Sequence, residues 1–187
     1  MNVVIFGPPG AGKGTQAQNI VKKFNLHQVS TGDLLRNEIK NKSEIGKEIE
    51  EIISKGDFAT DDIVNKLIKN IIFDPQKKNR LIFDGYPRSL SQAKNLDLWL
   101  TSSNQKIDFI FFLNVNKDII IKRIERRKIL ENRSDDDSNT ILKRYDIYMK
   151  ETKPILNFYS SKKEFHEIDG SHKIDEISSK INDIINV

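Results

Sequence analysis

A glycine-rich run between an apolar strand and a helix constrains this chain more than any other feature of its sequence. Residues 3–6 are VVIF, residues 7–15 are GPPGAGKGT, and a helical pattern follows from Lys13 to Phe24. Glycines let the backbone N–H groups of such a turn point inward, and the first N–H groups of a helix have no partner within it. A loop of this kind binds phosphate, and Lys13 is placed to reach the β- and γ-phosphates of a nucleotide.

The hydroxyl of this loop departs from the strict pattern. The common form G-x-x-x-x-G-K-[ST] places Ser or Thr directly after the lysine. Here Gly14 follows Lys13, and Thr15 carries the hydroxyl, which makes Thr15 a candidate metal ligand. The residues expected to bind the phosphates are Gly10, Ala11, Gly12, Lys13, Gly14 and Thr15.

Short apolar runs alternate with helical patterns along the rest of the chain. The expected strands are residues 3–6, 27–29, 80–83, 109–115 and 165–168, and the helical patterns cover residues 13–24, 63–72, 90–100, 119–129, 141–159 and 174–185. Strands that alternate with helices predict an α/β fold with three layers, in which helices cover both faces of a parallel sheet.

Two segments do not fit this alternation. Residues 30–59 contain two helical patterns, 32–39 and 43–55, with no strand between them. We interpret this segment as a small helical insertion. Residues 126–137 are polar and lack the apolar repeats of a core element, which predicts a short flap.

The composition excludes several classes of protein. The chain has no cysteine, so we expect no disulfide and no zinc site built from thiolates. Its apolar runs are shorter than the roughly 18 residues of a membrane span, so we expect no signal peptide or anchor and a cytoplasmic location. The net charge is +4, but basic and acidic residues are interspersed and no aromatic-basic motif is present, which disfavours nucleic-acid binding.

A second chemical signal lies at the end of the strand at 80–83. Asp84 and Gly85 follow it directly, and an Asp at the end of a second strand in a phosphate-loop protein typically holds a water on Mg²⁺. A GTPase-like switch would require the guanine-reading motif N-K-x-D. Residues 116–119 are NKDI and fail that motif, so a nucleotide-binding switch is a weaker interpretation.

Four motifs together resemble the adenylate kinase family. They are GPPGAGKGT at 7–15, STGDLLR at 30–36, DGYPRSLSQA at 84–93 and RSDD at 133–136, in the family's order and spacing. The resemblance covers essentially the whole chain. It implies Mg²⁺-dependent, direct in-line transfer of a phosphoryl group from ATP to AMP, which gives two ADP, by a monomeric enzyme.

The resemblance also implies a division of the chain. A P-loop NTPase core with a five-stranded parallel sheet would comprise residues 1–29, 60–125 and 137–187, with a monophosphate-binding insertion at 30–59 and a lid over ATP at 126–136. Because the flap is only about ten residues long and the chain has no cysteine, we expect the short-lid form without a zinc site.

Arginines are the expected catalytic groups. Phosphoryl transfer leaves the protein little covalent work, so positioning and charge stabilisation dominate, and a planar guanidinium can bind two phosphate oxygens at once. The candidates are Arg36, Arg88, Arg123, Arg127, Arg133 and Arg144. The resemblance assigns Arg36 and Arg88 to the AMP phosphate, and Arg123 and Arg127 to the ATP phosphates. It assigns Arg133 and Arg144 to the transferring group and to the bound monophosphate. The catalytic set that it implies is Lys13, Arg88, Arg123, Arg133 and Arg144.

The acceptor base is predicted from two positions. Thr31 and Gln92 match the family's adenine-recognising residues, and an amide can both donate and accept along an adenine edge. Pyrimidine monophosphate kinases resemble this chain closely but usually carry Ala and Asn there, so AMP is favoured and a UMP/CMP-type kinase is the alternative. The further substrate contacts that the resemblance implies are Asp57, Phe58, Ala59, Gly85, Tyr86 and Pro87; Tyr86 replaces the family's usual Phe.

The loop after the last expected strand contains His172, whose backbone matches the family's contact to the ATP adenine. The chain has two other histidines, His27 and His166. We expect no carboxylate or second histidine at ligand spacing near any of the three, and therefore neither a metal site nor a phosphohistidine.

Overall fold

The expected strands form one parallel sheet. The computed structural model describes residues 1–54, 57, 59–131 and 138–187, with residues 54, 127–131, 138, 139 and 141 described by their backbone only. The strands are β1 (Val3–Phe6), β2 (His27–Ser30), β3 (Leu81–Asp84), β4 (Phe109–Asn114) and β5 (Phe165–Asp169). Their order in the sheet is β2-β3-β1-β4-β5, and every neighbouring pair is parallel.

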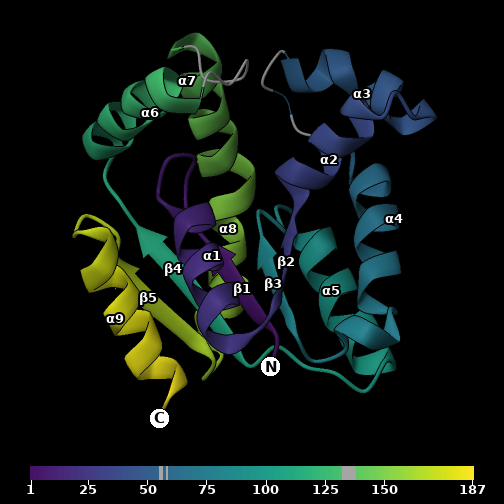
Figure 1. Ribbon diagram of the computed structural model, residues 1–187, viewed down its shortest axis with the longest axis vertical. Helices are drawn as coiled ribbons and strands as arrows, with labels where there is room; N and C mark the ends of the chain where they lie inside the picture. The colour runs from purple at the N-terminus through teal and green to yellow at the C-terminus, as the bar shows by residue number, and fades with distance from the viewer. Residues whose placement is uncertain (55–56, 58, 132–137) are drawn as a thin grey trace.

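Each face of the sheet packs against its own set of helices, because successive side chains of a strand point to opposite faces. Val4 and Phe6 belong to one core cluster, and Val3 and Ile5 belong to the other. The first cluster includes residues of α4 (Asp61–Ile72), α5 (Leu90–Ser102) and α8 (Lys153–Tyr159); the second includes residues of α1 (Lys13–Phe24), α6 (Lys117–Glu131) and α9 (Ile174–Ile185). The predicted three-layer α/β fold is confirmed (Figure 1).

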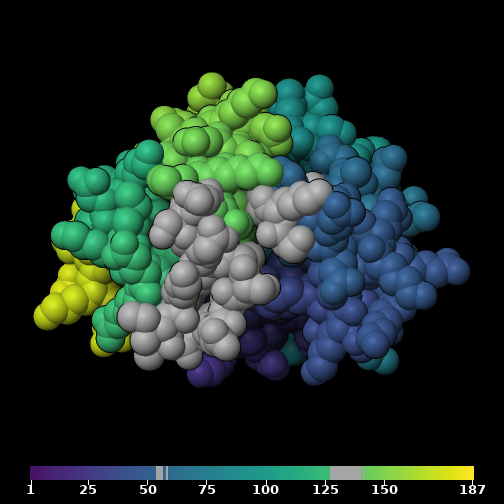
Figure 2. Space-filling model, turned by 90° about the horizontal axis from the view of Figure 1, so that it is seen from above, coloured from purple at the N-terminus to yellow at the C-terminus, as the bar shows by residue number. Residues whose placement is uncertain are grey.

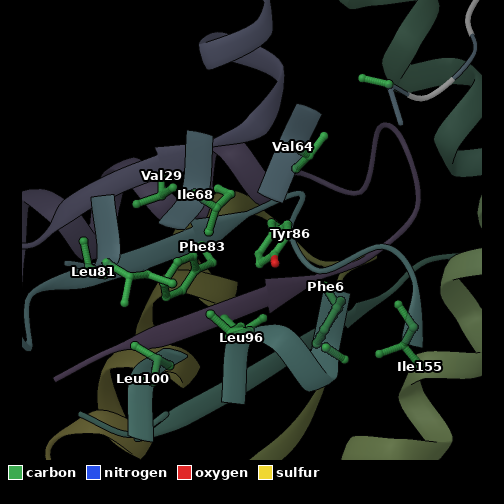
Figure 3. Packing of buried hydrophobic residues seen from close by; sticks show 14 of the residues in the cluster. Phe6, Val29, Val64, Ile68, Leu81, Phe83, Tyr86, Leu96, Leu100 and Ile155 are labelled. Carbon is green, nitrogen blue, oxygen red and sulfur yellow. The ribbon is translucent and has the colours of Figure 1, made fainter. Parts of the chain in front are cut away.

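The first cluster supports the segment that follows β3. Figure 3 shows Phe83 and Tyr86 close to Leu96 of α5 and Ile68 of α4. The rings of Phe83 and Tyr86 lie 6.3 Å apart, and Tyr86 is 1% exposed. This packing anchors the backbone immediately before Arg88.

Strand order places the loops that contain predicted site residues at one edge of the sheet. The chain passes from β1 to β2 and β3 on one side and to β4 and β5 on the other, so the direction of winding reverses at β1. In parallel α/β sheets the crevice at such a reversal, outside the carboxyl ends of the strands, is where ligands bind. The loops after β1, β3 and β5 all begin at this edge.

The insertion consists of the two predicted helices, α2 (Thr31–Lys40) and α3 (Glu44–Ser54). Ser30 caps α2 by accepting a hydrogen bond from the N–H of Asp33. Gly46 lies where α3 crosses α2 so closely that a β-carbon there would stand 2.1 Å from the carbonyl oxygen of Glu38. In Figure 1 the insertion lies at the top of the molecule, across from α6 and α7 (Ser138–Ile147).

The helical pattern predicted for 141–159 is interrupted. A π-helical turn, η2 (Tyr148–Thr152), separates α7 from α8, and the N–H of Lys153 donates to the carbonyl of Tyr148, five residues back. Pro154 follows and has no N–H to continue a regular α-helical ladder, which is a physical reason for the interruption. A short helix, η1 (Pro75–Lys77), precedes β3.

The structure also extends α6 beyond its expected end. The helix continues to Glu131, into residues that the sequence placed in the flap, and residues 132–136 of the predicted lid lie outside the described part of the chain. Within the described residues, every helix is too short or too polar to cross a membrane.

Candidate active site

The phosphate loop follows β1 and leads into α1. Gly10 has φ +81° and Gly12 has φ +94°, a conformation that glycine adopts without strain. A β-carbon at Gly10 would lie 2.7 Å from Cγ1 of Ile124, so the loop is packed tightly against α6. The ammonium of Lys13 donates to the carbonyls of Gly7 at 2.8 Å and Pro8 at 3.0 Å, which holds this cation across the loop.

Asp84 lies beside the end of this loop. Its Oδ2 accepts from Nε2 of Gln28 at 3.2 Å and is 3.6 Å from the position that a β-carbon of Gly14 would occupy. Among the described residues, no group of three or more His, Asp or Glu side chains could hold a metal by itself. A single carboxylate next to a phosphate loop fits Mg²⁺, which proteins usually hold through one or two carboxylates together with phosphates and water.

Arg123 connects the phosphate loop to the loop after β5. Its Nη1 donates to the carbonyl of Ala11 at 3.3 Å, and its Nη2 lies 3.5 Å from the carbonyl of His172. Burial lowers the pKa of Arg123. The backbone at His172 therefore lies on the same side of the sheet edge as the phosphate loop. Arg127 is described by its backbone alone, and Arg133 lies outside the described residues.

The expectation that no carboxylate lies near a histidine was wrong for His172. Its Nε2 is 3.3 Å from Oδ2 of Asp169, and its Nδ1 is 3.2 Å from Oε2 of Glu176. Glu176 lies one helical turn beyond His172, a spacing that brings side chains together. All three side chains are largely exposed, and they are not arranged so that they could hold a metal ion together.

A cavity of about 250 Å³ lies between the insertion and the core. We call it the insertion cavity. Figure 2 views the molecule from this end, with the insertion in blue and the residues of α7 and α8 in green. The predicted site residues that line it are Thr31, Arg36, Asp57, Ala59, Gly85, Arg88, Gln92 and Arg144. Tyr86 and Pro87 are buried and do not line the cavity, and Phe58 lies outside the described residues.

Three arginines converge on the insertion cavity from different elements. Arg36 comes from α2, Arg88 from the loop after β3, and Arg144 from α7. Burial, and then the charges of Arg144 and Arg36, lower the pKa of Arg88 to about 10, although Asp84 acts in the opposite direction. Arg36 also forms an ion pair with Asp33 on the exposed side of α2. A bound phosphate would offset the repulsion among the three guanidinium groups, so the cavity suits a phosphate.

Gly85 makes room for this arrangement. Its φ is +78°, and its carbonyl accepts from the Thr31 hydroxyl at 2.9 Å and from Nε of Arg88 at 2.8 Å. A β-carbon at Gly85 would lie 2.8 Å from Oγ1 of Thr31 and 2.9 Å from Nη2 of Arg88. Glycine at this position therefore permits both contacts.

The side chain of Gln92 is hydrogen-bonded at both ends of its amide. Nε2 donates to Oδ1 of Asp61 at 2.6 Å, and Oε1 accepts from the N–H of Arg88 at 2.7 Å. The hydroxyl of Tyr86 donates to Oδ1 of Asn65 at 2.9 Å, and the carbonyl of Gln92 lies 3.3 Å from it. The hydroxyl that distinguishes Tyr86 from the family's usual Phe thus ties α4 to α5.

Sequence reasoning did not single out several residues that contact the site. Asp61 and Ser89 surround Gln92, and Thr152 donates to the carbonyl of Arg88 at 3.2 Å. Ser89 could have been found, because it precedes the helix as an N-cap and accepts from the N–H of Gln92. Asp61 resembles any acidic residue in the first turn of a helix, and no pattern marks Thr152.

The position of Asp57 also had an unexpected outcome. The backbone contact to substrate that the sequence predicts there stays a prediction, and the side chain forms an ion pair with Lys143 at 2.7 Å. Lys143 belongs to α7, so this pair joins the segment after the insertion helices to the helix that carries Arg144. Both side chains are close to half exposed, which limits the energy of the pair.

A phosphate loop on β1 and an arginine-lined cavity beside it define a P-loop protein of the phosphotransferase class. The family model for adenylate kinase matches residues 5–164. The adenylate kinase of Pelagibacter ubique (strain HTCC1062) is 46% identical over 213 residues, and the alignment covers 100% of both chains. That of Flavobacterium psychrophilum is 37% identical over 187 residues, with 100% of this chain and 98% of the relative covered. That of Thermosipho africanus (strain TCF52B) is 32% identical, with 99% of each chain covered. The chain belongs to the adenylate kinase family.

Proposed function

We propose that this protein catalyses the reversible reaction ATP + AMP = 2 ADP by direct in-line transfer of the γ-phosphoryl group. The observation that carries the proposal is the short connection between two anion-binding regions. Asp84 lies beside the phosphate loop, and Arg88, four residues later, faces the insertion cavity. A donor phosphate on the loop and an acceptor phosphate in the cavity would approach each other across this segment.

On the donor side, the backbone of residues 10–15 and the ammonium of Lys13 bind the ATP phosphates. The contacts of Lys13 to the carbonyls of Gly7 and Pro8 support this role, since they hold a cation at the mouth of the loop. Arg123 and Arg127 complete the charge, and the backbone at His172 contacts the adenine. The bond of Arg123 to the carbonyl of Ala11 is consistent with a position next to the phosphates.

Mg²⁺ is the proposed cofactor, held through a water by Asp84 and, as a second possibility, by the hydroxyl of Thr15. When bound it would offset the negative charge of the ATP phosphates. The position of the Asp84 carboxylate, next to Gly14 and fixed by Gln28, supports this assignment.

On the acceptor side, Arg36 and Arg88 bind the AMP phosphate, while Arg133 and Arg144 close over the transferring group and the monophosphate. The convergence of Arg36, Arg88 and Arg144 on one cavity supports these roles. Thr31 and Gln92 recognise the base, and Asp57, Phe58, Ala59, Gly85, Tyr86 and Pro87 provide the remaining walls and backbone contacts.

We further propose that residues 30–59 move as the monophosphate-binding unit and that residues 126–136 act as a short lid which excludes water during transfer. The ion pair between Asp57 and Lys143 joins the end of the first segment to α7, the helix that follows the proposed lid. The alignment with the Pelagibacter ubique enzyme is longer than this whole chain, which is consistent with a shortened segment here. A monomeric state and a cytoplasmic location stay predictions.

The proposal is tested by offering AMP, GMP, UMP and CMP in turn with MgATP and measuring the ADP and the diphosphate product formed. We expect AMP to be the preferred acceptor. A variant with Thr31→Ala and Gln92→Asn, the residues usual in UMP/CMP-type kinases, should lose that preference, while Gln76→Asn on the exposed turn η1 should retain it. Preference of the unaltered protein for UMP would overturn the base assignment.

A further inference from the structure

The amide of Gln92 lies between one group that only accepts a hydrogen bond and one group that only donates one. Its Nε2 donates to the carboxylate of Asp61 and its Oε1 accepts from the backbone N–H of Arg88. An ionised carboxylate can only accept a hydrogen bond and a backbone N–H can only donate one. The amide therefore has one favourable orientation, because after a flip its oxygen would face the carboxylate and its nitrogen would face the N–H.

The carboxylate of Asp61 also fixes the backbone that carries this amide. Its Oδ2 accepts from the hydroxyl of Ser89 at 2.7 Å, and the oxygen of that hydroxyl accepts from the N–H of Gln92 at 3.1 Å. Asp61 begins α4, whereas Ser89 caps α5. The Asp61 side chain thus joins the first turns of the two helices and holds Gln92, which lies in the first turn of α5 and is 3% exposed.

The donor and the acceptor that remain free on the Gln92 amide have fixed positions. Nε2 keeps one N–H and Oε1 keeps one lone pair, and both Gln92 and Asp61 line the insertion cavity. Adenine presents an amino donor at its C6, where guanine presents an oxygen acceptor. An amide that can flip would serve either base, whereas a locked amide accepts from the adenine amino group and opposes the guanine oxygen.

We propose that Asp61 is a positioning residue that sets the base preference of this site by locking the Gln92 amide. Asp61 acts through Gln92 and does not itself contact the base. The inference rests on the proposed function, since it requires that Gln92 faces the base of the acceptor nucleotide.

The test compares Asp61→Ala, Asp61→Asn and the unaltered protein, with Asp62→Ala as the matched control. Asp62 lies in the same first turn of α4 and is exposed, so its removal takes the same charge from the helix start and leaves Gln92 untouched. Dissociation constants for AMP and GMP are measured by calorimetry, and KM values for AMP, GMP and ATP by steady-state kinetics.

For Asp61→Ala we expect AMP binding to weaken by about tenfold or more, the size of effect that loss of a hydrogen bond to a charged group produces. GMP binding should stay the same or improve, so the AMP-to-GMP preference falls by a similar factor while the KM for ATP is unchanged. Asp61→Asn should restore most of the preference, because its Oδ1 can still accept from Nε2 of Gln92. Asp62→Ala should behave as the unaltered protein.

An unchanged AMP-to-GMP preference in Asp61→Ala would overturn the proposal. So would equal losses of affinity for AMP, GMP and ATP, because they would mean that Asp61 only stabilises the helix starts. If Asp61→Ala does not fold, Asp61→Ser replaces it with the same expected loss, since its hydroxyl ends one bond short of the carboxylate oxygens. If the unaltered protein forms no ADP from ATP and AMP, the proposed function fails and this inference fails with it. If it forms ADP but the variants keep its preference, the inference alone fails.

Discussion

Replacing Arg88 by methionine should make this protein more stable and nearly inactive. Methionine keeps an unbranched stem of similar length but removes the guanidinium, which lies close to the charges of Arg144 and Arg36. The folded state pays to hold these cations together before an anion binds. The proposed reaction, in contrast, uses Arg88 on the acceptor phosphate. Stability and activity should therefore change in opposite directions.

The size of the stability gain follows from the pKa of Arg88. Burial and neighbouring cations lower it from 12.5 to about 10, so the folded state holds this proton less tightly than the unfolded state. The resulting penalty is fully present below the folded pKa and is relieved as the pH rises toward the unfolded value. At about 1.4 kcal/mol per pKa unit, the upper bound on this penalty is roughly 3 kcal/mol, and solvent screening makes the penalty smaller. The lost bond to the Gly85 carbonyl costs about 1 kcal/mol.

We therefore expect Arg88→Met to gain about 1–2 kcal/mol at neutral pH, which raises the melting temperature by roughly 2–6 °C in a chain of this size. Turnover should fall by about 10³- to 10⁵-fold, the range typical of an arginine that stabilises a transferring phosphoryl group. The measurements are thermal unfolding without nucleotide and ADP formation from ATP and AMP. Lys94→Met, which removes an exposed positive charge from α5, is the control and should change neither. A less stable Arg88→Met, or one with normal turnover, would refute the reasoning.

Three further predictions follow from the geometry of single residues. Gly85→Ala should destabilise the protein by about 1–3 kcal/mol in thermal unfolding and raise the KM for AMP, because the φ of Gly85 is +78° and a β-carbon there would meet two side chains. An unchanged KM for AMP would argue against the placement of the acceptor site. Gly46→Ala should cost about 1–3 kcal/mol or more, since its β-carbon would overlap the Glu38 carbonyl; a variant with unchanged melting temperature would contradict this close crossing. Asp57→Ala should change stability by less than about 1 kcal/mol and the KM for AMP by less than about threefold, because its ion pair with Lys143 is exposed; a larger loss would show that the side chain binds substrate.

The sequence predicted the sheet and the phosphate loop well because both depend on local patterns. β1 and α1 begin and end at the predicted residues, and each of the other strands differs by one residue at one or both ends. Short apolar runs rich in β-branched residues favour strands, and the glycines of residues 7–15 allow the positive φ values of the loop. The π-turn at Tyr148–Thr152 was not predicted, because periodicity alone does not locate the residue at which a proline disturbs a helix.

The motifs also predicted which arginines to consider, but only the fold brought them together. Arg36, Arg88 and Arg144 are separated by 52 and 56 residues in the chain, and they meet because α2, the loop after β3 and α7 converge on one cavity. The ion pair of Asp57 with Lys143 depends on the same convergence, and the sequence offered no signal for it.

The phosphate loop illustrates the difference between what the sequence determines and what the tertiary structure determines. The residues from Gly7 to Thr15 determine by themselves that a phosphate can bind, because backbone conformation and helix direction are local properties. The tertiary structure decides what lies next to that phosphate: the carboxylate of Asp84, the carbonyl at His172 and the cavity in which Asp61 orients Gln92. Contacts between side chains distant in sequence depend on the packing of whole elements, and no local pattern records that packing.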